Sequence, residues 1–326
     1  MNRRRAIAVL LASTTTPVLL AQTSTRIFRI GFLSGASRSS AGADVRTFLL
    51  EGLADLGYVQ GRNMTWHERY AEADFSRLDG LADELARLPV DVILTQTTPA
   101  TVAAGRASRE LPVVSVTSGD LLGAGVVKSL AKPGGNVTGL SFLGPELAVK
   151  QMELLKEIVP AVRKISLLAT RGTQPEVLFL REMERAAPAL GVSVWFAEAA
   201  PNVAFKSIFD NLSRLRIEAV LVAPSILNFA NWRETLGLAS RARIPLMFST
   251  SEGADAGGLL SYGINRREFY QKAAIFVDRI LKGAKPSDLP IEQPTRFELI
   301  VNLRSAKTLG VTVPQSILLR ADRTIE

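Results

Sequence analysis

Short apolar runs of the β type alternate with helical patterns along almost the whole chain, and this order restricts the fold more than any other feature. The first unit is the apolar run 27–33, followed by apolar residues at helical spacing from Val45 to Leu56, with Gly57 as the stop. Strands that alternate with helices build parallel sheets covered by helices on both faces. The sequence therefore predicts an α/β protein with doubly wound, Rossmann-like parallel sheets.

The alternation breaks once and then restarts, which indicates two lobes. Glycine and proline interrupt regular structure at residues 132–136 (KPGGN). Strands are predicted at 27–33, 64–70, 90–95 and 112–116 before the break, and at 137–142, 165–169, 192–196, 219–222 and 245–248 after it. Two domains of ordinary size, each with its own core, fit a chain of this length.

A further βα unit remains after the second sheet looks complete. A strand is predicted at 259–262 and a long helix at 266–281, which we interpret as a return to the first lobe. The run 297–301 and a helix at 305–309 would then cross again. We therefore predict three crossings forming a three-strand hinge. The predicted first lobe is 27–140 plus 261–288, and the second is 141–260 plus 289–326.

The first 21 residues have the pattern of a secretory signal. Arg3, Arg4 and Arg5 form a positive start, an apolar stretch covers residues 6–20, and Ala21 is a small residue at the expected cleavage point. A membrane anchor is the weaker interpretation, because the apolar stretch falls short of the roughly 20 residues that a bilayer span needs. The mature protein is therefore expected outside the cytoplasm, away from ATP, NAD and chromosomal DNA.

Composition narrows the compartment and the partners. The chain has no cysteine, which excludes disulfides, thiolate metal sites, a cysteine nucleophile and a lipid-modified cysteine anchor. An exported, unanchored protein is retained only where an outer membrane encloses it, so we predict the periplasm. The formal charge of +8 falls to +5 from Gln22 onward, and the basic residues are scattered among acids. No nucleic-acid partner is therefore expected.

Candidate ligand-binding residues follow the predicted strands, because ligands of doubly wound sheets bind beyond the carboxyl ends of the strands. These loops are rich in hydroxyl groups and glycine and carry few charges. The candidates are Ser34, Ser37, Thr97, Thr98, Thr117, Ser118, Asp120, Ser141, Arg171, Ser225, Ser249, Glu252 and Tyr262. Hydroxyl groups and helix N-termini suit a carboxylate, an acid suits an ammonium, and aromatic rings can cover an apolar body. The set predicts capture of a small zwitterion. The competing interpretation is that these residues cap helices, as Thr98 is placed to do.

Patterns for catalysis are weak. His67 is the only histidine and lies in a predicted strand far in sequence from any suitable serine. Residues 139–144 (GLSFLG) have one residue too many for a nucleophile elbow. Residues 123–128 share only two glycines with a dinucleotide fingerprint, and no metal-ligand cluster is present. The sequence therefore predicts a protein that is not an enzyme and has no cofactor or metal.

Six segments have the form of family signatures: residues 56–63 (LGYVQGRN), 130–141 (LAKPGGNVTGLS), 256–263 (AGGLLSYG), 280–286 (ILKGAKP), 289–299 (LPIEQPTRFEL) and 319–322 (LRAD). They resemble the signature segments of the ABC-transporter substrate-binding proteins related to tryptophan-binding periplasmic proteins. The similarity spans essentially the whole mature chain.

This resemblance implies a type I periplasmic-binding-protein fold that closes on a ligand and then docks on a membrane permease. It also implies that Asp120 occupies the family's Gly-Asp position and that Thr97, Thr98, Thr117 and Ser118 lie where related proteins hold a ligand carboxylate. One departure is that two leucines follow Gly119-Asp120 where the family commonly has Pro-Val. Since that loop faces the ligand, the identity of the ligand stays open.

The expected function is a periplasmic, monomeric solute-binding component of an ABC importer that delivers a small polar solute, with an amino acid as one possibility, to an inner-membrane permease. The alternative is a sensory subunit that reports ligand occupancy to a membrane receptor or kinase. A repressor effector domain shares the fold, but no helix-turn-helix precedes residue 27. An exported enzyme ranks last, for want of a base and a nucleophile.

Overall fold

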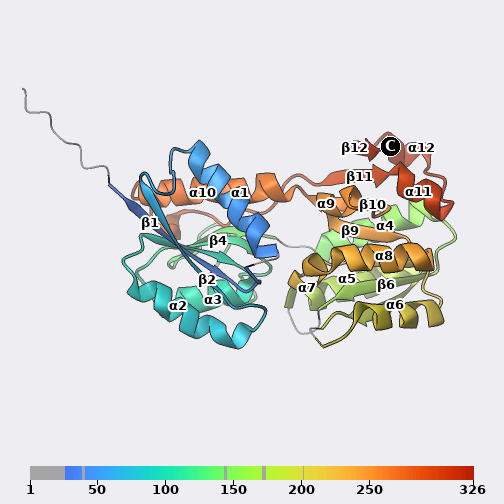
Figure 1. The fold of residues 1–326 in the computed structure, drawn as a ribbon, viewed down its shortest axis with the longest axis horizontal. Helices are drawn as coiled ribbons and strands as arrows, with labels where there is room; N and C mark the ends of the chain where they lie inside the picture. Colours follow the sequence, from blue (N-terminus) through green and yellow to red (C-terminus); the bar gives the residue numbers. More distant parts are fainter. Residues whose placement is uncertain (1–25, 39–40, 143–144, 171–173, 201) are drawn as a thin grey trace, which may run out of the picture.

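The chain forms two lobes that lie side by side, each built around one sheet (Figure 1). The computed structural model describes residues 26–38, 41–142, 145–170, 174–200 and 202–326. The predicted signal, residues 1–21, lies outside the described residues. The predicted fold class, α/β with two mainly parallel-sheet lobes, is confirmed.

The first lobe contains a five-stranded parallel sheet in the order β2-β1-β3-β4-β5. Its strands are β1 (Phe28–Ser34), β2 (Met64–Tyr70), β3 (Val92–Gln96), β4 (Val113–Ser118) and β5 (Val137–Ser141). Its helices are α1 (Ala41–Asp55), η1 (Phe75–Arg77), α2 (Leu78–Arg87), α3 (Thr98–Ala107), α10 (Arg266–Leu281) and η2 (Pro286–Asp288). The strand order reverses beside β1, as it does in doubly wound sheets that bind ligands at the reversal.

Successive side chains of β1 serve two separate cores, because side chains alternate across a strand. Ile30 and Phe32 point into the core under α1 and α10, where Phe276 is fully buried. Leu33 points to the opposite face, under α2 and α3. Helix α10 lies against α1 (Figure 1), although the two are far apart in sequence. The first lobe therefore depends on a helix supplied late in the chain.

The second lobe contains a seven-stranded sheet in the order β12-β11-β10-β9-β8-β6-β7. Its strands are β6 (Lys164–Ala169), β7 (Ser193–Glu198), β8 (Ala219–Val222), β9 (Leu246–Thr250), β10 (Leu260–Ile264), β11 (Glu298–Asn302) and β12 (Arg323–Ile325). Its helices are α4 (Pro145–Ile158), α5 (Gln174–Leu190), α6 (Phe205–Arg214), α7 (Ile226–Ala230), α8 (Trp232–Ala242), α9 (Ser251–Asp255), α11 (Leu303–Leu309) and α12 (Gln315–Leu318). All pairings are parallel except that of β10 with β11.

The second sheet also separates two cores. One core lies under α4 and α5 and includes Met152, Phe179 and Met183. The other lies under α6 and α8 and includes Phe209 and Leu238. Helices on both faces keep every central strand out of water, which explains why these strands are almost continuously apolar.

The chain passes between the lobes three times: after β5, after β10, and before β11. The predicted division placed residues 261–288 in the first lobe, whereas β10 pairs with β9 and β11 in the second sheet. The return to the first lobe begins at Asn265, which caps α10. The last passage also begins later than residue 289, because Leu289 and Ile291 pack in first-lobe cores and the backbone of Glu292 bonds to β5.

Two glycines allow strands to approach closely near these passages. Gly139, in β5, has φ +117°, and a Cβ there would overlap the carbonyl oxygen of Ser115 on β4. Gly263, in β10, is equally crowded, because a Cβ would overlap the carbonyl oxygen of Ser249 on β9. Any larger residue at either position would push neighbouring strands apart.

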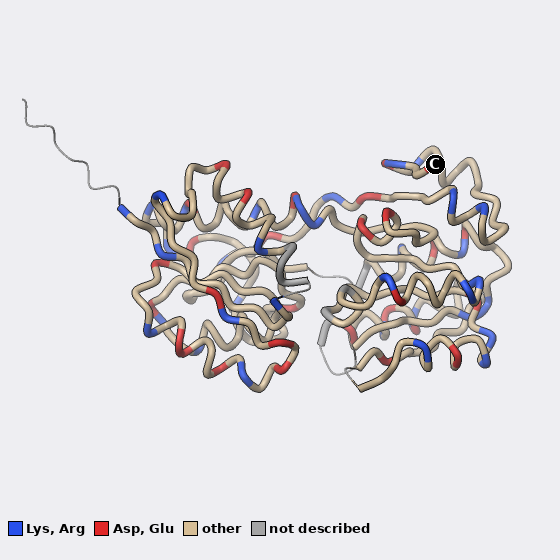
Figure 2. The backbone as a smooth tube through the Cα atoms, in the orientation of Figure 1, with Lys and Arg blue, Asp and Glu red and all other residues tan. Residues whose placement is uncertain are grey.

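Charges of both signs are interspersed over the described parts of the two lobes (Figure 2). This distribution agrees with the scattered charges of the sequence. Among the described residues, no helix is both long and apolar enough to cross a bilayer.

Candidate functional site

Thr97, at the turn from β3 into α3, has a strained backbone. Its φ of +87° is unusual for a β-branched residue. The turn is held by Thr97 N, which donates to Thr117 O (2.9 Å), and by Thr101, whose hydroxyl donates to Thr97 O (3.0 Å). Strained residues of this kind cluster at ligand-binding sites, because the surrounding structure must stabilise them. Thr97, rather than Thr98, is the N-cap of α3.

Hydroxyl groups at the carboxyl ends of the first sheet are joined in one network. Ser118 Oγ lies 2.9 Å from Thr101 Oγ1 and accepts from Ser115 Oγ (2.7 Å). Ser141 Oγ donates to the carbonyl of Gly119 (2.5 Å). Thr98 Oγ1 accepts from Gly119 N (2.9 Å). The network fixes the loops after β3, β4 and β5 relative to one another.

The predicted first-lobe residues therefore fall into two groups. Ser34, Ser118 and Ser141 are buried, and Ser34 Oγ donates to Gln96 Oε1 (2.7 Å). These three hydroxyls support the loops from within. The half-buried residues near the surface of the loops are Ser37, Thr97, Thr98, Thr117 and Asp120. Of these, Asp120 uses Oδ1 to accept from Gly123 N (2.7 Å), which closes its own turn.

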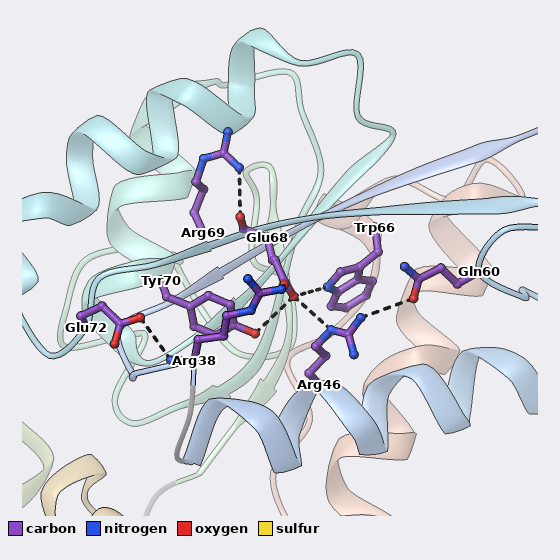
Figure 3. A network of polar contacts seen from close by, with 8 residues as sticks. All are labelled: Arg38, Arg46, Gln60, Trp66, Glu68, Arg69, Tyr70 and Glu72. Atoms are coloured by element: carbon purple, nitrogen blue, oxygen red, sulfur yellow. Dashed lines mark hydrogen bonds and ion pairs between the residues drawn. The ribbon is translucent and has the colours of Figure 1, made fainter.

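A cluster of polar side chains joins β2 to α1 and to the loop after β1 (Figure 3). Its centre is Glu68, whose Oε2 accepts from Arg46 Nε (3.0 Å), Trp66 Nε1 (3.1 Å) and Tyr70 OH (3.3 Å). Arg38 also pairs with Glu68. Burial, reinforced by the charge of Glu68, raises the pKa of Tyr70 to about 12, so its phenol stays protonated and donates.

The Glu68 cluster fixes the position of the Arg38 guanidinium, which follows the predicted site residue Ser37 in the chain. The side chain of Arg38 is 71% exposed, while Glu68 beneath it is only 14% exposed. Arg38 N also donates to Glu72 Oε1 (3.2 Å). The backbone of Glu72 has a φ of +54°. The sequence analysis missed this cluster. The alternation of Trp66, Glu68 and Tyr70 on one face of a strand could have revealed it.

In the second lobe, the short helix α7 organises the ends of two strands. Ser225, a predicted site residue, caps α7 by accepting from Asn228 N (3.2 Å). Asn228 Nδ2 donates to Leu168 O (2.9 Å) and to Ala223 O (2.8 Å). Leu168 lies near the end of β6, and Ala223 directly follows β8. Ser225 is therefore a helix cap, and Asn228, which the sequence analysis missed, links the strands. The three-residue spacing from a serine at a strand end was the available signal.

Ser249 and Tyr262 are joined through Gln151 of α4. Gln151 Nε2 donates to Ser249 Oγ (3.1 Å) and to the backbone carbonyl of Tyr262 (2.6 Å). The ring of Tyr262 packs against Phe297, with 5.8 Å between ring centroids. Ser249 is buried and Tyr262 is half-buried, and both are linked to α4 inside the second lobe.

Two acids lie near the ends of second-lobe strands. Glu252, a predicted site residue on α9, pairs with the buried Arg266 at the start of α10 (3.6 Å). Glu176, in the first turn of α5, was not predicted. Burial raises the pKa of Glu176 to about 7, and its Oε2 is buried without a hydrogen-bond partner among the described residues. The remaining candidate, Arg171, lies outside the described residues.

A small cavity lies at the carboxyl ends of β8 and β9. Its volume is about 10 Å³, which is room for one water-sized group. It is lined by Val222, Ala223, Pro224, Asn228, Trp232, Phe248, Ser249 and Thr250. Helix α7, which carries Asn228, approaches α1 of the first lobe. The cavity is thus placed at the side of the second lobe that faces the first.

The described residues contain no group of three or more histidine, cysteine, aspartate or glutamate side chains placed to hold a metal ion. The chemistry of the two strand-end regions is hydrogen bonding by hydroxyl and amide groups, beside aromatic walls. This arrangement suits binding of a small solute that carries both polar and apolar parts.

Known proteins with similar sequences and structures agree with this geometry. The "Tyrosine-binding protein" of Clostridioides difficile (strain R20291) is 25% identical over 263 residues, which are 80% of this chain and 75% of that protein. The crystal structure of an ABC domain in complex with L-Trp from Streptococcus pneumoniae is 26% identical, with a TM-score of 0.83. A conserved domain protein from Vibrio cholerae is 25% identical, with a TM-score of 0.84. Each structural match covers 92% of this chain and 100% of the other.

The resemblance inferred from the signature segments is confirmed by a match along nearly the whole chain. The family described as ABC transporter substrate binding protein matches residues 32–325. Members of this family bind the substrates of ABC transporters. Two lobes with mainly parallel sheets, and with polar loops at the ends of the strands, form an architecture that suits the binding of a small solute. The chain therefore belongs to the family of ABC transporter substrate-binding proteins.

Proposed function

We propose that this protein is the periplasmic component of an ABC importer, and that it captures a free amino acid between its lobes and delivers it unchanged to a membrane permease. The observation that carries the proposal is the preformed first-lobe site. Thr97 is strained at φ +87°, and the hydroxyl network holds the surrounding loops in place. Such pre-organisation lowers the entropy that ligand binding must overcome.

The first-lobe site suits a carboxylate. Thr97 and Thr98 are half-buried hydroxyl residues at the N-terminus of α3, a helix of 10 residues. A helix N-terminus carries partial positive charge and favours anions. The exposed guanidinium of Arg38 lies on the loop after β1 and adds positive charge there, which its partner Glu68 offsets in part. A ligand carboxylate would be bound by this combination.

Relatives support an amino acid as the class of ligand. The Clostridioides difficile protein is named for tyrosine, and the Streptococcus pneumoniae structure contains L-Trp. Both are about a quarter identical to this chain over most of its length. Both relatives and the first-lobe geometry thus favour an amino acid over a sugar or a metal ion.

Capture would proceed by closure of the lobes about the three connecting segments. A ligand that contacts both lobes stabilises the closed form by its differential affinity, and the closed form is what the permease would accept. Removal of residues 1–21 during export would leave the mature protein as a monomer in the periplasm.

Binding is tested with the mature protein, residues 22–326. The standard L-amino acids, simple carboxylates, nucleobases and sugars are screened by thermal shift, and hits are measured by calorimetry. At least one amino acid should raise the melting temperature in a concentration-dependent way and reduce the radius of gyration in solution scattering. Conversion of any ligand into a product, or stabilisation only by non-amino-acid solutes, would overturn the proposal.

A variant pair tests the first-lobe site itself. Thr98→Val removes the half-buried hydroxyl at the start of α3, and we expect about tenfold weaker binding. Thr308→Val is the matched control, because Thr308 Oγ1 bonds within α11 to Arg304 O (2.9 Å) in the exposed part of the second lobe.

Delivery is tested by uptake of the labelled amino acid into vesicles that contain the cognate permease. Binding without uptake, together with activation of a sensor kinase, would favour the sensory role instead.

A further inference from the structure

Asn228, on α7 in the second lobe, has an amide whose orientation is fixed by its surroundings. Its Nδ2 donates to two carbonyls, Leu168 O (2.9 Å) and Ala223 O (2.8 Å). Turning the amide over would place Oδ1 against both of these acceptors. The Nδ2 group therefore faces the strand ends, and Oδ1 is an acceptor on the other side.

This oxygen is buried and unused. The residue is 3% exposed, and Oδ1 has no hydrogen-bond partner among the described residues. Nearly all buried polar groups in native proteins are hydrogen-bonded, so an acceptor left open at a strand end calls for a donor from elsewhere. Asn228 also lines the small cavity at the ends of β8 and β9.

The cavity indicates what kind of donor would fit. Its lining is mainly apolar, and Val222, Pro224, Trp232 and Phe248 are among the residues that line it. None of the residues that line it is acidic. A charged ammonium would lose its hydration here and would find only neutral acceptors, which is unfavourable. A neutral O–H or N–H group at the end of an aromatic ring suits both the mainly apolar lining and the unused acceptor, Asn228 Oδ1.

We propose that Asn228 Oδ1 accepts a hydrogen bond from the tip of the ligand's side chain, and that this contact makes the protein selective for aromatic amino acids that carry a phenolic O–H or an indole N–H. The inference rests on the proposed function, because it assigns the side-chain end of the same ligand. Two observations place the contact. The cavity has room for one water-sized group, and α7 approaches α1 of the first lobe. A ligand held by its carboxylate in the first lobe would extend its side chain towards Asn228.

Ligand pairs test the proposal on the unaltered mature protein. L-tyrosine is compared with L-phenylalanine, and L-tryptophan with 1-methyl-L-tryptophan, by calorimetry at the same pH and salt. Each second ligand lacks the donor. We expect it to bind about 10- to 100-fold more weakly, because its binding would leave Oδ1 buried and unpaired. Equal dissociation constants within each pair would overturn the proposal.

A variant pair assigns any such preference to Asn228. Asn228→Ala should reduce the ratio of affinities within each ligand pair to about one. Asn231→Ala is the matched control, because Asn231 Nδ2 donates to Leu227 O (2.8 Å) at the end of the same helix and does not line the cavity. The control should keep the full ratio. A preserved ratio in Asn228→Ala would overturn the proposal. If this variant does not fold, the ligand pairs on the unaltered protein decide the question.

The outcomes separate this inference from the proposed function. Binding of amino acids with no preference for a side-chain donor, or with a preference for aliphatic side chains, would reject the role of Asn228 and leave the amino-acid function standing. Failure of every amino acid to bind would reject the proposed function itself.

Discussion

The carboxyl ends of the two sheets differ in how completely their polar groups are satisfied. In the first lobe, the buried hydroxyls of Ser34, Ser118 and Ser141 all have hydrogen-bond partners. In the second lobe, Asn228 Oδ1 and Glu176 Oε2 are buried without such partners among the described residues. The first-lobe hydroxyls are thus satisfied before any ligand arrives, whereas the second lobe retains unused acceptors. If the proposed function holds, the first lobe would orient the ligand and the second lobe would discriminate between ligands.

The largest expected effect concerns a feature that both lobes have, a glycine at a point where two strands lie very close together. Gly139→Ala and Gly263→Ala would each force a Cβ into the backbone of a neighbouring strand. We expect each substitution to lower the free energy of unfolding by about 3 kcal/mol or more, because a backbone carbonyl cannot move aside as a flexible side chain can. Chemical denaturation monitored by circular dichroism measures the loss.

Gly80→Ala is the control for these glycines. Gly80 lies within α2, and a Cβ at this position would have no other atom within 4 Å. Its replacement should stabilise the protein by up to about 1 kcal/mol, because alanine is the better helix former. Tolerance of alanine at only one of Gly139 and Gly263 would show that the strands of the two lobes are not equally constrained.

The second effect belongs to the second lobe alone. Burial raises the pKa of Glu176 from its ordinary 4.5 to about 7. A raised pKa means that the carboxyl is protonated in both states below pH 4.5, and that stability is lost as the pH rises from there through 7. Glu176→Gln should therefore change little at about pH 4 and should stabilise the protein at about pH 8 by up to about 3 kcal/mol.

Glu157 on α4 supplies a control of opposite sign. Hydrogen bonds from Ser316 and Arg320 lower the pKa of Glu157, so its contribution to stability is present at neutral pH and is lost on acidification. Glu157→Gln should therefore be less stable than the natural protein at about pH 8. If Glu176→Gln were also less stable than the natural protein at that pH, Glu176 would not be destabilised by burial of its charge.

The third effect concerns the passage between the lobes. Glu252 of α9 pairs with Arg266, whose side chain is 5% exposed. Glu252→Gln would remove a counter-charge from a buried cation and should lower the free energy of unfolding by about 1 to 2 kcal/mol. Asp210→Asn, which breaks an exposed pair with Lys206 (2.6 Å), should stay within about 0.5 kcal/mol. A loss of ligand affinity in Glu252→Gln at unchanged stability would instead restore Glu252 as a ligand contact.

The smallest expected effect comes from replacing a buried serine by alanine in each of the two sheets. Ser118 and Ser261 are both buried strand serines, but of the two only Ser118 Oγ has hydrogen-bond partners among the described residues. Ser118→Ala should cost about 1 kcal/mol, and Ser261→Ala should be neutral or slightly stabilising. Denaturant midpoints of the two variants measure the difference. Equal costs would mean that the contrast between satisfied and unsatisfied polar groups does not extend to the strands.

The sequence was sufficient for the architecture because burial on both faces of a sheet imposes a long, repeated pattern. Every central strand was predicted to within a few residues. The misses are short or polar elements. Helix α7 has five residues, too few for a helical period, and β12 is a polar edge strand that buries little. The 3₁₀ turn η1 is also short, with three residues, and Asp74 caps it by accepting from Ser76 N (3.1 Å).

The site was predicted less well, for a physical reason. The strand-end rule located the loops, but it cannot tell which hydroxyls point inward. Thr97 and Ser118 are equally suited to a ligand by composition, yet Ser118 is buried in a network and Thr97 is half-buried at a strained turn. Asn228 was missed because its role depends on two carbonyls, one of them from a strand that is distant in sequence.

The late contribution of α10 to the first lobe has a consequence for how the protein is made. Tyr58 OH donates to Asp278 Oδ1 (2.9 Å) across 220 residues of chain, and Phe32 shares a core with Phe276. One face of the first sheet is therefore covered by α1 alone until nearly all of the polypeptide has emerged, while β6–β10 of the second lobe can already pair. Contacts of such long range form slowly, and until they form, exposed hydrophobic surface can cause aggregation. The half of the molecule that is synthesised first is thus the half that would gain most from a chaperone that shields the nascent chain.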